Sequence, residues 1–265
     1  MLGIECAGEV VAAPGSSLPV GQRVVAIMGG MGRQFDGSYA EYALVPQQNV
    51  FPLQTQLEWK RLAALPEMLQ TVRGSLHVGL EIERANNIFV RGATSSIGFT
   101  AISLARSAGL EVTATTRNPA KANELKAAGA AHVIVDDGVI AGKARAIYPG
   151  GYDRVLELVG TTTLLDSLQA TCRGGIVCMT GILGGSWILQ DFQPVGDVPT
   201  GVKLASYSGE ASDITCAQLQ RYVSLVESDK LVLKLDPSFH FRNLREAHTM
   251  MDENRASGKI VIEVG

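Results

Sequence analysis

The 265-residue sequence has few charges of either sign, few aromatic residues and only four cysteines. Charged residues make up 18% of the chain, aromatic residues 6%, and the formal net charge is −3. Because no Lys/Arg block occurs, the sequence lacks the basic surface that nucleic acid binding requires. The cysteines are scattered without a CxxC pair, which is typical of buried thiols in a reducing compartment rather than of disulfides or zinc sites: Cys6, Cys172, Cys178 and Cys216.

Signals for export and membrane insertion are also missing. The first five residues, MLGIE, lack the basic and then apolar pattern of a signal peptide. The uncharged residues 174–190 are too few and too rich in glycine to span a bilayer. We therefore expect a cytoplasmic protein with no membrane segment.

Glycine and hydrophobic residues, by contrast, are abundant. The 29 glycines are about 11% of the chain, against a usual value of about 7%. This excess indicates tight turns and close approaches of the backbone to a ligand. Hydrophobic residues make up 46%, which excludes a disordered or collagen-like chain.

The N-terminal part has the pattern of antiparallel β-structure. Residues 8–11 and 21–26 are short β-prone runs, and residues 37–45 alternate small or apolar with polar residues. A helix is predicted to begin at Pro66 and to end at about Val78.

The middle of the chain predicts strands that alternate with helices. The expected strands are residues 88–90, 112–115, 132–135, 155–159 and 176–179, and the first helix covers residues 97–108. Such alternation predicts a parallel sheet with helices on both faces. Ligands of this architecture bind at the carboxyl ends of the strands, near the point where the strand order reverses.

The C-terminal part predicts a helix at 213–228, a strand at 231–235, a helix at 244–253 and a last strand at 259–264. The last strand cannot extend the parallel sheet without another crossover, so we expect it to return to the N-terminal β-domain. The predicted domains are residues 1–75 with 232–265, and residues 76–231.

A glycine-rich turn, GATSSIG at 92–98, follows a strand and begins a helix. The pyrophosphate of a dinucleotide needs this geometry, because the turn brings free helix N–H groups to the phosphates. The G-x-G-x-x-G pattern is imperfect, since Ala93 and Ser95 take the first two glycine positions. We expect Ser95 and Ser96 to offer hydroxyls to the phosphate instead. Taken alone, the motif also fits the alternative of a structural turn that binds no dinucleotide.

The end of the next strand predicts the cofactor's form. An NAD site usually has Asp or Glu about 20 residues after the turn, to bind the ribose 2′-hydroxyl. Here the sequence is TTRN at 115–118, with no acid, and Lys121 follows one helical turn later. Two cations and two hydroxyls suit a 2′-phosphate, which favours NADPH. The alternative is that Arg117 and Lys121 are solvated surface residues.

Six short segments run in order along essentially the whole chain: GIECAGEV at 3–10, GQRV at 21–24, GSYAEY at 37–42, GATSSIG at 92–98, LELVG at 156–160 and SGKIV at 257–261. In this order they resemble the zinc-independent branch of the medium-chain dehydrogenase/reductase superfamily, in particular NADPH:quinone oxidoreductases and related alkenal or enoyl reductases. The resemblance implies an α/β fold, a Rossmann doubly wound parallel sheet inserted in a partial GroES-like β-domain.

The resemblance also implies which residues bind the cofactor, in three groups. The turn would hold the pyrophosphate, with Ala93, Thr94, Ser95, Ser96, Ile97 and Gly98. The adenosine phosphate would lie near Thr116, Arg117 and Lys121. The nicotinamide and its ribose would lie along Leu158, Val159 and Gly160, and along Thr180, Gly181, Ile182 and Leu183. No catalytic side chain is named, because the cofactor carries hydride chemistry and a proton can come from solvent.

Three departures from the family pattern matter. Zinc-dependent relatives have His where this chain has Ile4, and a cysteine near residues 66–74 where this chain has none, so we expect no zinc. Asp136 lies where quinone reductases often have a tyrosine beside the 2′-phosphate. Relatives carry further residues before the motif that begins here at Gly3, and we expect a late start codon and, for the chain as given, an incompletely covered β-domain.

The expected function is an NADPH-dependent oxidoreductase that transfers hydride to a quinone or an activated C=C bond of a small molecule. The alternative is an inactive NADPH-binding redox sensor. We expect a homodimer paired through an edge strand at 201–207. Tyr39 and Tyr42 are predicted to be packing residues and Glu67 a helix N-terminal carboxylate, while Trp187 is either a packing residue or a substrate-facing one.

Overall fold

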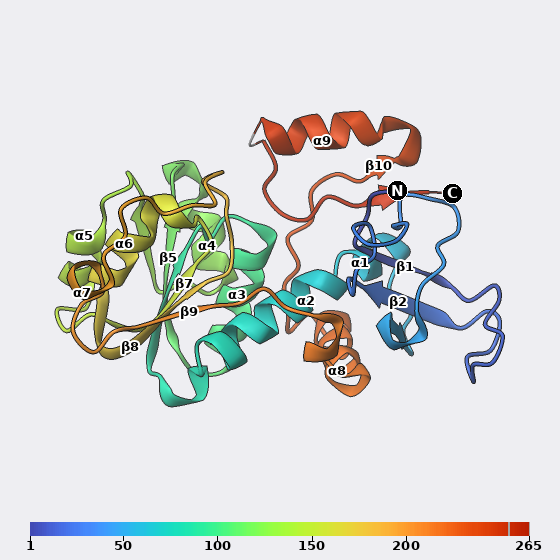
Figure 1. Cartoon of the computed structure of the whole chain (residues 1–265), viewed down its shortest axis with the longest axis horizontal. Helices are drawn as coiled ribbons and strands as arrows, with labels where there is room; N and C mark the ends of the chain where they lie inside the picture. Colours follow the sequence, from blue (N-terminus) through green and yellow to red (C-terminus); the bar gives the residue numbers. More distant parts are fainter. Residues whose placement is uncertain (254, 265) are drawn as a thin grey trace. The chain divides into compact units, whose positions relative to one another are not determined.

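The computed structural model describes residues 1–253 and 255–264, and the chain divides into two compact units (Figure 1). The first consists of Met1–Gln70 and Gly209–Gly265, and the second of Thr71–Ser208. These limits differ from the predicted ends of the nucleotide domain, 76 and 231. The difference arises mainly because helix α8 (Cys216–Glu227) groups with the N-terminal residues, where Gln220 hydrogen-bonds both backbone groups of Gln54.

A six-stranded parallel sheet forms the centre of the second unit, in the order β6-β5-β4-β7-β8-β9. The chain passes from β4 outward to β6, and then returns to place β7, β8 and β9 on the other side. The strand order therefore reverses between β4 and β7, which confirms the predicted doubly wound α/β fold. The strands are β4 (Asn87–Arg91), β5 (Glu111–Thr116), β6 (His132–Val135), β7 (Tyr152–Glu157), β8 (Thr171–Met179) and β9 (Lys203–Ser206).

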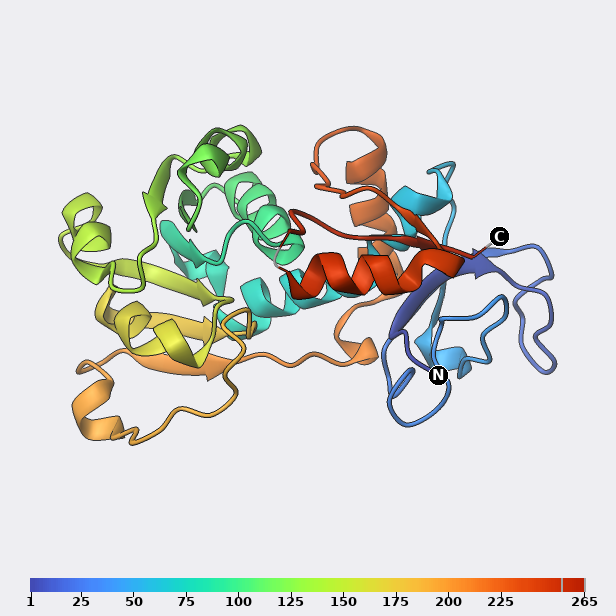
Figure 2. The same cartoon turned by 90° about the horizontal axis from the view of Figure 1, so that it is seen from above.

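Helices lie on both sides of this sheet (Figure 2). Phe89, Val155 and Val177 of the central strands are fully buried in an apolar cluster with residues of α5 and α6. Gly129 ends α4 in the left-handed conformation, which glycine adopts readily at the end of a helix. The helices are α3 (Ser96–Ser107), α4 (Ala122–Ala128), α5 (Ala141–Ile147), α6 (Thr161–Gln169) and α7 (Pro194–Asp197), with the 3₁₀ turns η3 (Ile82–Arg84) and η4 (Pro119–Lys121).

The predicted helix at Pro66 changes its winding part of the way along. It is an α-helix, α2 (Pro66–Arg73), that continues as a π-helical turn, η2 (Gly74–Gly79). The N–H of Leu80 donates to the carbonyl of Ser75, five residues back. Single π turns occur often at functional sites.

The first unit contains a small antiparallel sheet, β1-β2-β3, and a two-stranded parallel pair, β10-β11. Its last strand belongs to this unit, as predicted, but is only two residues long and pairs with β10. The elements are β1 (Glu5–Glu9), β2 (Arg23–Ile27), β3 (Val50–Pro52), β10 (Phe239–His240), β11 (Ile262–Glu263), α1 (Trp59–Ala63), α8 and α9 (Leu244–Asp252), with the 3₁₀ turns η1 (Gln47–Asn49), η5 (Ala211–Asp213) and η6 (Phe241–Asn243).

Two predicted strands are wrong. Residues 37–45 form bends and irregular backbone, because the N–H groups of Gly37 and Tyr39 donate to carbonyls at the start of the chain rather than to a neighbouring strand. A Cβ atom on Gly37 would lie 2.3 Å from the carbonyl oxygens of Leu2 and Gly3, so only glycine fits there. Residues 231–235 form a single bridge, between Leu235 and Lys259.

A partly buried ion cluster joins three segments of the first unit. The Nζ of Lys259 donates to the carboxylate of Glu5 in β1 and lies 3.5 Å from the carboxylate of Glu67 at the start of α2. The backbone N–H of Glu67 also donates to Glu5, at 2.9 Å. Glu67 was predicted to be a carboxylate that interacts with the helix dipole. In the structure its carboxylate also faces the cation of Lys259.

No helix in the described ranges is both long and apolar enough to cross a membrane.

Candidate functional site

Four of the predicted segments follow four neighbouring strands of the parallel sheet. Residues 93–98 follow β4, residues 116–121 span the end of β5 and the turn after it, residues 158–160 follow β7, and residues 180–183 follow β8. Because the strands are parallel, their carboxyl ends lie at one edge of the sheet, on both sides of the point where the strand order reverses. The structure therefore brings the predicted residues to one edge.

The glycine-rich turn is held by Ser95 at the N-terminus of α3. The Ser95 hydroxyl donates to the carbonyl of Gly92 at 2.9 Å and accepts the N–H of Gly98 at 3.1 Å. This hydroxyl is therefore used within the turn, and the expectation that Ser95 serves a phosphate stays a prediction. In the described part of the chain, the Ser96 hydroxyl and the N–H groups of Ser96 and Ile97 make no hydrogen bond.

Glycine is required at both ends of the turn. Gly92 has φ +79°, a left-handed conformation that side chains disfavour. A Cβ atom on Gly98 would lie 2.5 Å from the Cα and carbonyl oxygen of Ala93, so the helix can approach the turn this closely only without a side chain.

The end of β5 combines bound hydroxyls with an exposed cation. Thr115, which the sequence did not single out as a site residue, accepts the N–H of Gly92 at 3.1 Å and so ties β5 to the turn. The Thr116 hydroxyl bonds both backbone groups of Asn118, at 3.0 and 3.1 Å, and is not free for a phosphate. Arg117 is exposed, Lys121 is half-buried, and within the described residues neither makes a side-chain hydrogen bond or ion pair.

The loop after β7 is fixed by the buried side chain of Glu157. One carboxylate oxygen accepts the N–H groups of Val159 at 2.7 Å and Gly160 at 3.0 Å, and the other accepts the hydroxyl of Ser167. Burial raises the pKa of Glu157, and these hydrogen bonds oppose the rise. Glu157 thus sets the course of residues 158–160, a role that was not predicted from the sequence.

The loop after β8 interlocks with the loop after β7. The N–H of Thr180 donates to the carbonyl of Glu157 at 2.9 Å, and that of Leu183 to Leu158 at 3.1 Å. A Cβ atom on Gly181 would lie 2.4 Å from the carbonyl oxygen of Leu158, so these loops are in close contact. Within the described residues, the carbonyl of Thr180 and the N–H of Ile182 make no hydrogen bond.

The same two loops also reach the glycine-rich turn. A Cβ atom on Gly92 would lie 3.1 Å from the Cβ of Leu158, 3.2 Å from the Cδ1 of Leu183 and 3.3 Å from the Cγ2 of Val159. The turn and the loops after β7 and β8 are therefore neighbours.

Beneath this edge lies a buried charge network that the sequence analysis missed. Arg91, the last residue of β4, is fully buried and donates to Asp136 at 2.8 and 3.0 Å and to Asp166 at 2.7 Å. Asp136 is therefore paired with Arg91. An arginine at the end of a buried central strand was the signal, because a buried cation needs acidic partners.

The remaining candidates of the sequence analysis are not among the residues of this edge. Tyr39 belongs to the first unit, where its hydroxyl oxygen lies 3.3 Å from the Nε2 of His248. Tyr42, in the same unit, is 72% exposed. Trp187 is 78% exposed, so it does not pack in a core. The described residues contain no group of three His, Cys, Asp or Glu side chains that could hold a metal ion.

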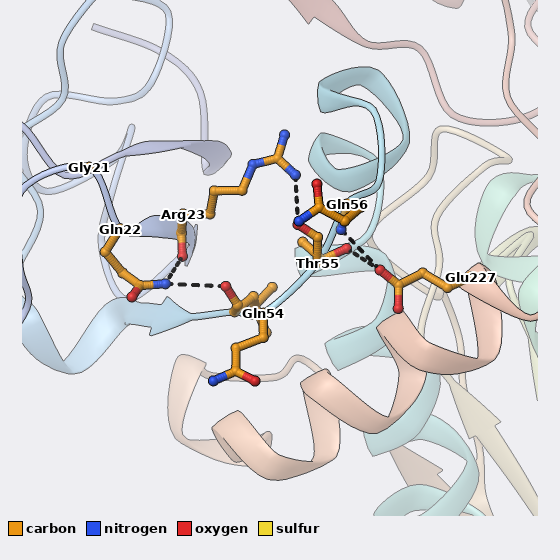
Figure 3. Close-up of a pocket in the computed structure, with 8 residues that line it drawn as sticks. Gly21, Gln22, Arg23, Gln54, Thr55, Gln56 and Glu227 are labelled. Atoms are coloured by element: carbon orange, nitrogen blue, oxygen red, sulfur yellow. Dashed lines mark hydrogen bonds between the residues drawn. The ribbon is translucent and has the colours of Figure 1, made fainter.

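A separate pocket of about 510 Å³ lies in the first unit (Figure 3). Its polar groups largely satisfy one another: Arg23 donates to the carbonyl of Thr55 at 2.9 Å, and the Thr55 hydroxyl donates to Glu227 at 2.6 Å (Figure 3). Gln22 likewise donates to the carbonyl of Leu53. None of the predicted cofactor residues lines this pocket.

Comparison with known families decides the class of the protein. Residues 128–262 match the family described as zinc-binding dehydrogenase, and residues 1–55 match the alcohol dehydrogenase GroES-like domain. The chain belongs to the zinc-binding dehydrogenase family. It is an oxidoreductase of the medium-chain dehydrogenase/reductase type, as the sequence predicted, with a GroES-like N-terminal domain and a Rossmann-like parallel sheet. The prediction that this member holds no zinc stays a prediction.

Individual relatives agree with this assignment. The protein YhfP of Bacillus subtilis (strain 168) is 28% identical over 270 residues, which cover 100% of this chain and 81% of YhfP. The quinone oxidoreductase of Sus scrofa is 27% identical over 263 residues, covering 98% of this chain and 76% of that enzyme. The crystal structure of Bacillus subtilis yhfP with NAD bound superposes with a TM-score of 0.81 at 26% identity, over 100% of this chain and 81% of that one.

Proposed function

We propose that this oxidoreductase binds NADPH along the carboxyl edge of its parallel sheet and transfers hydride to a quinone or to an activated C=C bond of a small molecule. The observation that carries the proposal is the meeting of the glycine-rich turn with the loops after β7 and β8. A similar protein, yhfP, has NAD bound in its crystal structure, and a relative is a quinone oxidoreductase. When bound, the nicotinamide supplies the hydride.

The start of α3 fits a pyrophosphate. The N–H groups of Ser96 and Ile97 are free within the described residues, and they begin a 12-residue helix. The positive end of the helix dipole and free N–H donors together favour an anion at this place. The Ser96 hydroxyl adds a third donor.

The end of β5 fits a 2′-phosphate better than a free ribose hydroxyl. Arg117 and Lys121 are the nearby cations, and neither is engaged by another described residue. The carboxylate of the adjacent strand end, Asp136, is paired with Arg91 and so does not confront the phosphate with a free negative charge. For this reason we favour NADPH over NADH.

The loop after β8 fits the carboxamide of a nicotinamide. The free carbonyl of Thr180 is an acceptor and the free N–H of Ile182, two residues later, is a donor. A primary carboxamide offers the complementary NH₂ donor and C=O acceptor. These groups, with the turn and the cation pair, match the three parts of the dinucleotide.

Dissociation constants for NADPH and NADH test the proposal, measured by fluorescence titration on the wild-type chain, Arg117→Ala and Arg117→Asp. Loss of charge-assisted hydrogen bonds of about 1.5–3 kcal/mol each should weaken NADPH about 10- to 100-fold and leave NADH nearly unchanged. Arg117→Asp should shift the preference toward NADH, because it adds repulsion against the phosphate and an acceptor for the ribose. Equal losses for both cofactors would contradict the assignment of Arg117.

Turnover tests the reaction itself. The wild-type chain with NADPH and a panel of quinones and enones should oxidise the cofactor with at least one of them. Tight NADPH binding without turnover of any of these acceptors would contradict the proposed reaction and favour the redox-sensor alternative.

A further inference from the structure

The π-helical turn η2 carries a serine that the proposed function does not use. Ser75 is fully buried, and its hydroxyl lies 2.7 Å from the carbonyl of Thr71 and 2.9 Å from the hydroxyl of Thr180. Thr180 in turn lies 3.6 Å from the thiol of Cys178. All four residues belong to the second unit.

The chemistry of these groups fixes the direction of the hydrogen bonds. A serine hydroxyl has one proton, and here it is donated to the carbonyl of Thr71. Thr180 must therefore donate to Ser75, and its oxygen accepts the thiol proton of Cys178. The thiol remains a donor, since burial raises the pKa of Cys178. The Thr180 side chain is thus held from two sides in one orientation.

Close packing prevents this contact from slipping. A Cβ atom on Gly74 would overlap the ring of Tyr207, and one on Gly79 would lie 2.4 Å from the Sγ of Cys178. Glycines on both sides of Ser75 therefore let the π turn lie directly against β8 and the residue after β9. The extra residue of a π turn opens the helix locally, and such turns are frequent at functional sites.

We propose that Ser75 is a positioning residue, which acts through the Thr180 hydroxyl to orient the Thr180 carbonyl toward the carboxamide of the nicotinamide. The inference rests on the proposed cofactor site and adds to it a residue from a segment that does not belong to the edge of the sheet. The N–H groups of Thr180 and Gly181 both donate to the carbonyl of Glu157, at 2.9 and 3.2 Å, so the peptide that carries the Thr180 carbonyl is held at its Gly181 end. The contact with Ser75 holds the other end of that peptide, because it fixes the side chain on the Cα of Thr180.

The test compares binding of whole and truncated cofactor. NADPH carries the carboxamide, whereas 2′,5′-ADP occupies only the adenosine end of the site. We expect Ser75→Ala and Thr180→Val each to weaken NADPH about 3- to 10-fold, the effect of one neutral hydrogen bond. Binding of 2′,5′-ADP should change less than about twofold. Thr180→Ser keeps the hydroxyl and should bind NADPH as the wild type does.

Ser107→Ala is the matched control. The Ser107 hydroxyl donates to the carbonyl of Ser103, four residues back, as Ser75 does to Thr71, but it lies on the exposed face of α3. This variant should leave both dissociation constants unchanged. The double variant Ser75→Ala/Thr180→Val should be no weaker than either single one, because both remove the same contact.

Two results overturn the inference. If Ser75→Ala weakens NADPH and 2′,5′-ADP equally, Ser75 supports the fold rather than the carboxamide; if it changes neither, Ser75 has no part in binding. Failure of the proposed function looks different: the wild-type chain itself would then bind neither NADPH nor 2′,5′-ADP, and the inference falls with it.

Discussion

Gly98→Ala is the most informative single change at the glycine-rich turn. A Cβ atom there would lie 2.5 Å from two backbone atoms of Ala93 and 2.6 Å from a third, and backbone cannot rotate away as a side chain can. Ordinary contacts of a Cβ begin near 3.4 Å, so the turn and the helix must separate by about 0.9 Å. Overpacking of this kind costs about 1–3 kcal/mol.

Helix propensity alone predicts the opposite sign. Alanine is favoured over glycine by about 0.5–1 kcal/mol inside a helix. Gly142→Ala in α5 isolates this effect, because a Cβ atom there meets nothing within 4 Å. We expect Gly142→Ala to be at least as stable as the wild type and Gly98→Ala to lose stability, which urea unfolding measures.

The same displacement should weaken the cofactor. Moving Ser96 and Ile97 by nearly 1 Å lengthens hydrogen bonds to a phosphate that are worth about 1.5–3 kcal/mol each, so NADPH should bind at least about tenfold more weakly. Fluorescence titration of Gly98→Ala and Gly142→Ala gives the comparison. If the two variants were equally stable and bound NADPH equally well, the close approach at Gly98 would have no consequence and the argument from steric overlap would be refuted.

Three further changes follow from other parts of the structure. Lys259→Met leaves the partly buried carboxylates of Glu5 and Glu67 without their cation, so it should lower the free energy of unfolding by about 1–3 kcal/mol at pH 8, as chemical denaturation measures. The pKa of Glu5, already raised by burial, then rises further, so the loss should shrink as the pH falls toward 5. Burial and the negative charge of Glu5 raise the pKa of Cys6 from 9.0 to about 11, so the thiolate fraction at pH 8 is about a hundredth of that of a free thiol. Alkylation followed by mass spectrometry should therefore find Cys6 modified about a hundredfold more slowly than a free thiol. Labelling at the rate of a free thiol would contradict this. Leu204→Lys, on the edge strand β9, should convert the proposed homodimer to a monomer in light scattering, and a monomeric wild type would count against pairing through that edge.

Local signals made the parallel sheet and the turn predictable. Strand–helix alternation and the glycines at 92 and 98 each depend on neighbours in sequence, and they predicted the order of strands and turns along the sheet. The strand predicted at residues 37–45 was wrong because alternation of polar and apolar residues does not determine which backbone groups these residues will hydrogen-bond. Here the partner is the start of the chain, so no strand forms.

The side chains that support the edge were not predictable in the same way. Arg91 meets Asp136 and Asp166, which lie 45 and 75 residues away, and Ser75 meets Thr180 across 105 residues. Such contacts depend on the finished fold and not on any local period. The sequence could show only that Arg91 needed acidic partners, without saying which carboxylates these were.

The buried charge network of Arg91, Asp136 and Asp166 limits which substitutions the protein can accept during evolution. Replacing one of these residues alone leaves a charge in the interior without its partner, so substitutions at the three positions should occur together or not at all. Arg117 follows the neighbouring strand β5 and is exposed, so its replacement leaves no buried charge unpaired. If Arg117 reads the 2′-phosphate as proposed, a single substitution there can change the cofactor preference while Arg91, Asp136 and Asp166 stay the same.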